Sequence, residues 1–205
     1  HYRANGNWPD LPMARTTAAT AYSLFGGRLD TGNMASSKHF MAMAPLANML
    51  HIGAHGMLDD ARPLEGGIQL SDTMLTIAQV YGLQLPARLA MLTACHSGGG
   101  VQQRGEGILS LSRAFAHAGC RSLVTSLWEA SADATADIST SFYEQLHRGE
   151  AHDIALQKAQ ITYLKEAPPE RRHPYFWAGY VLIGEGGTIS VASKAWYASP
   201  LVWML

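Results

Sequence analysis

Two stretches of sequence decide the fold of this chain: Leu50-His51-Ile52-Gly53-Ala54-His55-Gly56 and Ala90-Met91-Leu92-Thr93-Ala94-Cys95-His96. Each is a short apolar run that ends at a reactive side chain, and such runs are typical of strands buried in a parallel sheet. A third buried strand is expected at 122–127. Because ligands of parallel sheets bind at the carboxyl ends of the strands, we expect His55 and Cys95 to meet at one edge of the sheet.

The segments around these strands have the patterns of helices and of further strands. A fourth strand is expected at 175–183, and 67–70 has the pattern of an edge strand. Strand and helix alternate along the chain, which predicts an α/β fold: a mostly parallel central sheet flanked by helices on both faces. The expected helices span 14–25, 35–44, 71–80, 109–117, 131–147 and 153–165.

The pair of His55 and Cys95 has the chemistry of a nucleophilic catalyst. A thiol becomes a strong nucleophile when a neighbouring imidazole takes its proton, and the imidazolium can then protonate a leaving amine. The backbone N–H groups of Gly56 and Cys95 would stabilise the developing oxyanion. His96 is the rival base, but adjacent residues of an extended chain point to opposite sides, which disfavours it as a partner of Cys95.

Structural roles compete with these assignments. A cysteine at the end of a strand is more often a packed core residue than a nucleophile, and this is our expectation for Cys120. His51, inside a strand, is likewise expected to be packed. A zinc site would need partners at spacings that the sequence lacks, and the glycines after Cys95 are not followed by the Lys-Ser/Thr of a phosphate-binding loop. We therefore expect no metal and no other cofactor.

Composition limits the possible partners. The chain has 205 residues, of which 47% are hydrophobic, enough for one α/β core. The formal net charge of −1 gives no electrostatic reason to bind nucleic acid or an anionic membrane. No apolar run approaches the roughly twenty residues that span a bilayer. Two cysteines do not make a disulfide framework, so we expect a cytoplasmic location. Since the first residue is His1, we expect the chain to be part of a longer protein.

Four segments together resemble the CHAT domain, a bacterial branch of the caspase/separase-like (clan CD) cysteine peptidases. They lie in the order of that family over roughly residues 8–185. The segment that holds Cys95, Ala94-Cys95-His96-Ser97-Gly98, is also similar to the nucleophile segment of metacaspases. The four matching segments span 50–56, 92–100, 111–128 and 173–184, the last of which begins His173-Pro174-Tyr175-Phe176-Trp177-Ala178-Gly179-Tyr180.

The resemblance implies a caspase-like α/β fold in which His55 is the general base and acid and Cys95 is the nucleophile. It also implies that Gly56 and Cys95 supply the oxyanion donors, and that upstream helical repeats of the TPR type hold or release the peptidase. We expect residues 1–187 to form the peptidase domain and 188–205 to form an apolar tail that docks on the domain or on a partner.

The resemblance further places the substrate pocket at Ser126, Trp128, Glu129 and Asp133. Trp128 matches a residue that lines this pocket in caspase-like enzymes. Glu129 stands where caspases that cut after Asp hold an Arg, so an acidic side chain there would favour a basic P1 residue through charge-assisted hydrogen bonds. CHAT relatives usually have an Asp four residues after the Trp, where this chain has Ala132, and Asp133 follows it. The structural alternatives to a substrate pocket are that Trp128 is a core residue and that Glu129 and Asp133 are solvated at the start of a helix.

The leading hypothesis is therefore a cysteine endopeptidase that cleaves a specific protein partner and is regulated by a region or subunit outside this chain. The glycine-rich segment 98–107 is the expected mobile element that reorders on activation. One alternative is a non-catalytic caspase-like module that binds proteins through its apolar tail and its weakly charged surface. A weaker alternative is a small-molecule hydrolase with the same His–Cys pair.

Overall fold

The computed structural model describes residues 8, 10–57, 62–93, 95–96, 106–128, 131–189 and 202–204. The main sheet has six strands in the order β1-β10-β2-β6-β8-β9. All neighbouring strands in it are parallel except β8 and β9. The chain is thus a mixed α/β protein with a mostly parallel sheet. Its strands are β1 (Arg28–Asp30), β2 (Met49–Ile52), β6 (Leu89–Leu92), β8 (Ser122–Ser126), β9 (Tyr180–Gly184) and β10 (Val202–Met204).

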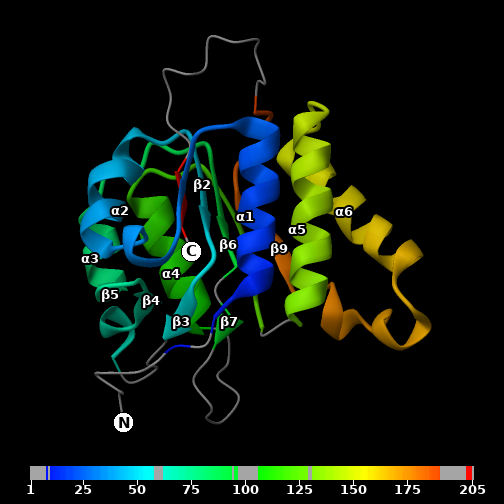
Figure 1. Ribbon diagram of the computed structural model, residues 1–205, viewed down its shortest axis with the longest axis horizontal. Coiled ribbons are helices and arrows are strands. Elements are labelled where there is room, and N and C mark those ends of the chain that lie inside the picture. Colours follow the sequence, from blue (N-terminus) through cyan, green and yellow to red (C-terminus); the bar gives the residue numbers. More distant parts are fainter. Residues whose placement is uncertain are drawn as a thin grey trace.

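A second, smaller sheet continues from the ends of two of these strands. Its order is β5-β4-β3-β7, and only β3 and β7 are parallel to each other. In Figure 1, β3 and β7 lie together at the lower end of the molecule, beyond the ends of β2 and β6. The four strands are β3 (His55–Met57), β4 (Gly67–Gln69), β5 (Met74–Thr76) and β7 (Cys95–His96).

The helices begin and end at residues suited to those positions. Pro12 starts the first helix, where its missing N–H costs nothing, and Gly26 ends it with a φ of 70°. The Ser131 hydroxyl caps α5 by accepting a hydrogen bond from the N–H of Ala134. Among the described residues, every helix is too short or too polar to cross a membrane. The helices are α1 (Pro12–Phe25), α2 (Ser37–Met43), α3 (Ile77–Tyr81), α4 (Glu106–His117), α5 (Ala132–His147) and α6 (His152–Glu166).

Buried apolar side chains form two clusters. Leu50 and Ile52 of β2 pack with residues of α2, α3 and α4, among them Phe40 and Phe115. Met49, on the same strand, packs instead with residues of α1, α5 and α6. Figure 1 shows α1, α5 and α6 grouped beside one another, away from α2, α3 and α4. Because successive residues of a strand point to opposite sides and all four residues of β2 are buried, its apolar side chains supply both clusters.

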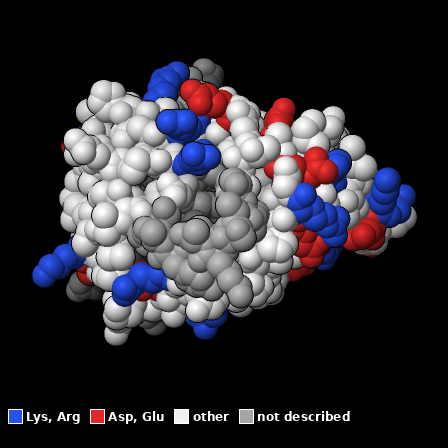
Figure 2. Space-filling model, turned by 90° about the horizontal axis from the view of Figure 1, so that it is seen from above, with Lys and Arg blue, Asp and Glu red and all other residues white. Residues whose placement is uncertain are grey.

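The surface charge is unevenly distributed. Figure 2 views the molecule from the end opposite to β3 and β7, and acidic and basic residues gather there toward α6. Lys158 of α6 pairs with Glu150, which lies just before that helix. The part of this face toward α2 and α3 carries fewer charges (Figure 2).

Three expected elements differ in the structure. The helix expected over 71–80 is wrong in its first half, because Met74–Thr76 forms β5 and the capping box of Thr76 and Gln79 delays the helix to Ile77. The segment 67–70 is not an edge strand, since β4 lies between β5 and β3. The strand expected at 175–183 begins only at Tyr180, after a 3₁₀ turn at Pro174–Phe176.

Candidate active site

The two motif strands run side by side from the main sheet into the small one. Met49 lies opposite Leu89 and Ile52 opposite Leu92 in the main sheet. Beyond a break of two residues, His55 lies opposite Cys95 with the same offset in residue number. The N–H of Thr93 donates to the carbonyl of Ile52 at 3.0 Å, which ties the strands together at the break. The register thus makes His55 and Cys95 direct neighbours on adjacent parallel strands.

His55 is held in the middle of the small sheet. Its other neighbour is Gln69 of β4, on the side away from Cys95. The indole of Trp8 stacks on the imidazole, with ring centroids 5.2 Å apart and planes inclined by 29°. The side chain is 8% exposed, so it is nearly enclosed. The pairing with a strand on each side holds the backbone of His55, and the Trp8 ring on one face limits the freedom of the imidazole.

The small sheet depends on a close approach of two backbones at Gly67. A Cβ there would lie 2.8 Å from the backbone of Thr76 and would collide with the carbonyl of Leu75. Only glycine allows β4 and β5 to pair this closely, and β4 in turn pairs with the strand of His55.

A cavity of about 390 Å³ lies next to His55, on the side of Gln69. Trp8, Leu11 and Leu70 contribute to its walls. No local pattern in the sequence marks this cavity. Trp8 precedes the first helix, and only the tertiary structure brings it to β3.

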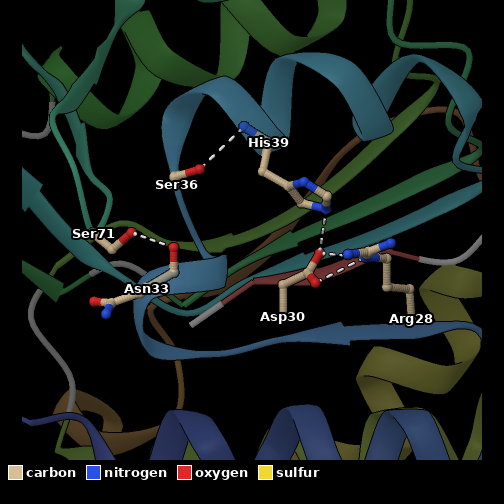
Figure 3. A network of polar contacts seen from close by, with 6 residues as sticks. All are labelled: Arg28, Asp30, Asn33, Ser36, His39 and Ser71. Carbon is tan, nitrogen blue, oxygen red and sulfur yellow. Dashed lines mark hydrogen bonds and ion pairs between the residues drawn. The ribbon is translucent and has the colours of Figure 1, made fainter.

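A polar network supports the segment after β1 that lines this cavity (Figure 3). Asp30 is only 3% exposed and accepts hydrogen bonds from the Arg28 guanidinium at 2.8 and 2.9 Å. Nε2 of His39, on α2, lies 3.2 Å from the same carboxylate. The Ser71 hydroxyl donates to the Asn33 carbonyl at 3.3 Å. The network therefore joins β1 and the turn after it to α2 and to the loop that follows β4.

The expected pocket residues Ser126 and Trp128 lie together, Ser126 as the last residue of β8 and Trp128 two residues after it. Thr125 of β8 lies opposite Leu92 of β6. Trp128 comes three residues after Thr125, just as Cys95 comes three residues after Leu92. The Trp128 indole N–H donates to the carbonyl of Tyr175 at 2.8 Å, and the ring remains 37% exposed. The Ser126 hydroxyl donates to the Trp128 carbonyl at 2.7 Å. Trp128 is thus anchored but accessible, which disagrees with a purely internal packing role.

Gly179 makes room for this arrangement. A Cβ at Gly179 would lie 2.8 Å from both Cε2 of Trp128 and Oγ of Ser126. The segment 173–184, which contributes to the family resemblance, therefore contacts the expected pocket directly.

Of the two acidic residues expected in the pocket, the structure describes only Asp133. Asp133, in the first turn of α5, accepts a hydrogen bond from Arg171 at 2.9 Å, so its carboxylate is already paired within the chain. Glu129 lies outside the described residues, as do 98–105 of the glycine-rich segment. The end of that segment is helical, since α4 begins at Glu106.

The packing roles expected for His51 and Cys120 are confirmed. His51 is fully buried, and its Nδ1 lies 2.7 Å from the Tyr143 hydroxyl. Burial lowers the pKa of His51 to about 3. Burial likewise raises the pKa of Cys120 to about 11, which keeps this thiol protonated at neutral pH. Neither side chain has the properties of a catalytic group.

Gly56 lies within β3, opposite Ile68 and His96. Its backbone N–H therefore lies in the plane of a sheet with a strand on each side, and its oxyanion role stays a prediction. Among the residues that the structure describes, no group of three or more His, Cys, Asp or Glu side chains is arranged to hold a metal ion.

Two comparisons with known proteins bear on this site. Tetratricopeptide repeat protein 28 of Homo sapiens is 32% identical to this chain over 115 residues, which are 56% of the chain and 4% of that protein. Tetratricopeptide repeat protein 28 of Mus musculus is 23% identical over 215 residues, covering 86% of the chain and 9% of that protein. The chain thus spans less than a tenth of either relative. Both relatives are mammalian, so they give no support to a bacterial source.

A family model described as the CHAT domain matches residues 2–185. This range includes both motif strands, the His55–Cys95 neighbours and the segment that anchors Trp128. The chain therefore belongs to the CHAT domain family, which is caspase-like and related to the clan CD cysteine peptidases.

Proposed function

We propose that this CHAT domain is a cysteine endopeptidase in which Cys95 is the nucleophile and His55 is the general base and acid. The observation that carries the proposal is the register of β3 and β7, which makes these two residues neighbours. A caspase-like arrangement, with helices on both faces of the sheet, is part of the proposal, and the two core clusters support it.

The reaction begins when His55 takes the proton of the Cys95 thiol. The thiolate adds to the carbonyl carbon of the scissile amide, and the N–H groups of Gly56 and Cys95 stabilise the oxyanion. The carbon–nitrogen bond then breaks as the His55 imidazolium protonates the departing amine. Water, deprotonated by His55, hydrolyses the thioester and releases the acid. The stack with Trp8 supports this role, because it fixes the plane of the imidazole.

Trp128 and Ser126 are proposed to form the wall of the substrate pocket on the acyl side. The exposed ring of Trp128 supports this assignment. A basic P1 residue would pair with Glu129 and Asp133. Since Asp133 already pairs with Arg171, a substrate would have to compete for that carboxylate.

Regulation is proposed to come from outside the chain, through a helical-repeat region. The names of the two relatives support this part, because both are tetratricopeptide repeat proteins. The division into a domain at 1–187 and a docking tail at 188–205 is also proposed. The place of β10 between β1 and β2 supports docking of the tail on the domain itself. A cytoplasmic location is proposed from the cysteine content alone.

A covalent probe tests the proposed nucleophile without knowledge of the natural substrate. The full chain is treated with peptidyl acyloxymethyl ketones that carry Arg, Lys or Asp at P1, and the adduct is located by mass spectrometry. We expect one adduct at Cys95, fastest with Arg or Lys, and a loss of at least 100-fold in labelling rate in His55→Ala.

The matched control is Cys120→Ser, which removes the other thiol and should label like the parent chain. Peptides hydrolysed by the parent chain should not be hydrolysed by Cys95→Ala. If Cys95 takes up no probe while the chain still binds its protein partner, the non-catalytic binding module is the correct description.

A further inference from the structure

We propose that the cavity beside His55 is the S1′ subsite, which binds the first residue after the scissile bond and prefers a large apolar or aromatic side chain there. The inference rests on the proposed peptidase function and adds a specificity that the family assignment does not contain.

The strand order gives the direction of the substrate. Within the main sheet, β6 lies between β2 and β8. The residues that follow these strands therefore come in the order His55, Cys95, Trp128 along the edge of the sheet. The cavity lies beyond the other end of this row, since it is lined by Gln69, the neighbour of His55 on the side away from Cys95, and by Gly32 after β1.

The chemistry of the reaction decides which half of the peptide lies on each side. After the carbon–sulfur bond forms, the acyl half stays attached to Cys95. The nitrogen of the leaving half must lie next to the imidazole that protonates it. The acyl half thus extends from Cys95 toward Trp128, and the leaving half extends past His55. Its first side chain meets the cavity.

The walls of the cavity determine what it can select. Trp8, Leu11, Ala54 and Leu70 give it apolar surface. A volume of about 390 Å³ can hold any natural side chain. A large apolar side chain would therefore remove the most surface from water in this cavity.

Apart from His55, the polar side chains that the described part of the chain contributes to the walls already have partners within the chain. The Arg15 guanidinium pairs with Asp10 at 2.9 Å, at an exposed position. The Gln69 amide donates to the Leu70 carbonyl at 2.7 Å, and the Ser71 hydroxyl donates to the Asn33 carbonyl. A charged P1′ side chain would have to break such a pair or enter without one, which disfavours it.

The test uses internally quenched peptides that differ only at P1′, with Gly, Ala, Asp, Lys, Leu or Phe. We expect kcat/KM for Leu and Phe to exceed that for Gly and Asp by at least tenfold. Trp8→Ala should reduce this ratio to less than threefold, and Trp8→Phe should retain it. Because the readout is a ratio within one variant, a general loss of folded enzyme does not change it.

Tyr22→Ala is the matched control, since it removes an exposed aromatic ring from α1 outside the cavity and should leave the ratio unchanged. A second arm adds leucine amide or glycine amide to the acyl-enzyme. Leucine amide should capture the acyl group at least five times more efficiently, because it occupies the same subsite as the leaving half.

The outcomes separate this inference from the proposed function. Hydrolysis with no P1′ preference, or a preference that survives in Trp8→Ala, overturns the subsite while the peptidase stands. If no peptide is hydrolysed and Cys95 takes up no covalent probe, both proposals are overturned.

Discussion

His55 and Cys95 are direct neighbours on two parallel strands, and the register that joins them begins six residues earlier, in the main sheet. The pairing of Met49 with Leu89 and of Ile52 with Leu92 fixes the pairing at the site. A change in the register of β2 and β6 would thus separate His55 from Cys95, and the buried apolar side chains of both strands oppose such a slip. The packing of the core therefore also fixes the geometry of the site.

Gly179→Ala should damage the substrate pocket. The added Cβ would lie 2.8 Å from Trp128 and Ser126, so the ring must move away from its hydrogen bond to Tyr175. We expect a change in tryptophan fluorescence and a fall in kcat/KM of about tenfold, since a clash of this kind costs roughly 1–3 kcal/mol.

Gly82→Ala is the control for this change. A Cβ at Gly82 meets only the Gln79 carbonyl, at the ordinary distance of 3.4 Å. Its fluorescence and activity should match those of the parent chain. Equal behaviour of the two variants would contradict the close packing of Gly179 against Trp128.

Acid should destabilise the fold through His51. The unfolded chain binds a proton at this imidazole near pH 6.5, whereas the folded chain does so only near pH 3. Stability from this group is therefore full above pH 6.5 and is lost as the pH falls toward 3. Between pH 7 and pH 5 the contribution of His51 to the free energy of unfolding should fall by about 2 kcal/mol.

Urea unfolding at the two pH values measures this effect. His51→Gln keeps a hydrogen-bonding group for Tyr143 and removes the titration, so its stability should change less between pH 7 and 5. His152, whose pKa burial also lowers, contributes equally to both proteins and cancels in the comparison. Equal pH dependence of the two chains would rule out His51 as the source.

Iodoacetamide should distinguish the two cysteines. Burial and a pKa raised to about 11 keep the Cys120 thiol protonated, and its sulfur donates to the Ser122 carbonyl at 3.2 Å. Native protein at pH 7.5 should therefore be alkylated at Cys95 alone, and urea-unfolded protein at both. Cys95→Ala should take up no label when folded, and labelling of native Cys120 would contradict its place in the core.

Two ion pairs of equal length test the effect of burial. Arg28 pairs with Asp30 at 2.8 Å, and Asp30 is almost fully buried (Figure 3). Arg62 pairs with Glu65 at the same distance, but both side chains are more than half exposed. Asp30→Asn should lower the free energy of unfolding by about 1–3 kcal/mol. Glu65→Gln should change it by less than about 0.5 kcal/mol. Similar losses in the two variants would show that burial does not strengthen the Asp30 network.

Local sequence patterns predicted the parts of the fold that depend on near neighbours. Apolar runs located β2, β6 and β8, and helical patterns located α5 and α6 to within a residue or two. They failed at 71–80, because β5 has only three residues and the alternation of its side chains is too brief to recognise. They also failed at 175–179, where the 3₁₀ turn interrupts an apolar and aromatic run.

By itself, the sequence determined that a histidine and a cysteine each end a buried strand, and that Cys120 and His51 belong to the core. The apolar pattern of neighbouring residues indicates which strands are buried, so these assignments do not depend on contacts between distant parts of the chain. Only the tertiary structure decided that Trp8 stacks on His55, that Arg171 pairs with Asp133, and that a cavity adjoins the site. These contacts join residues far apart in the chain, and they exist because strand register and helix packing bring those residues together.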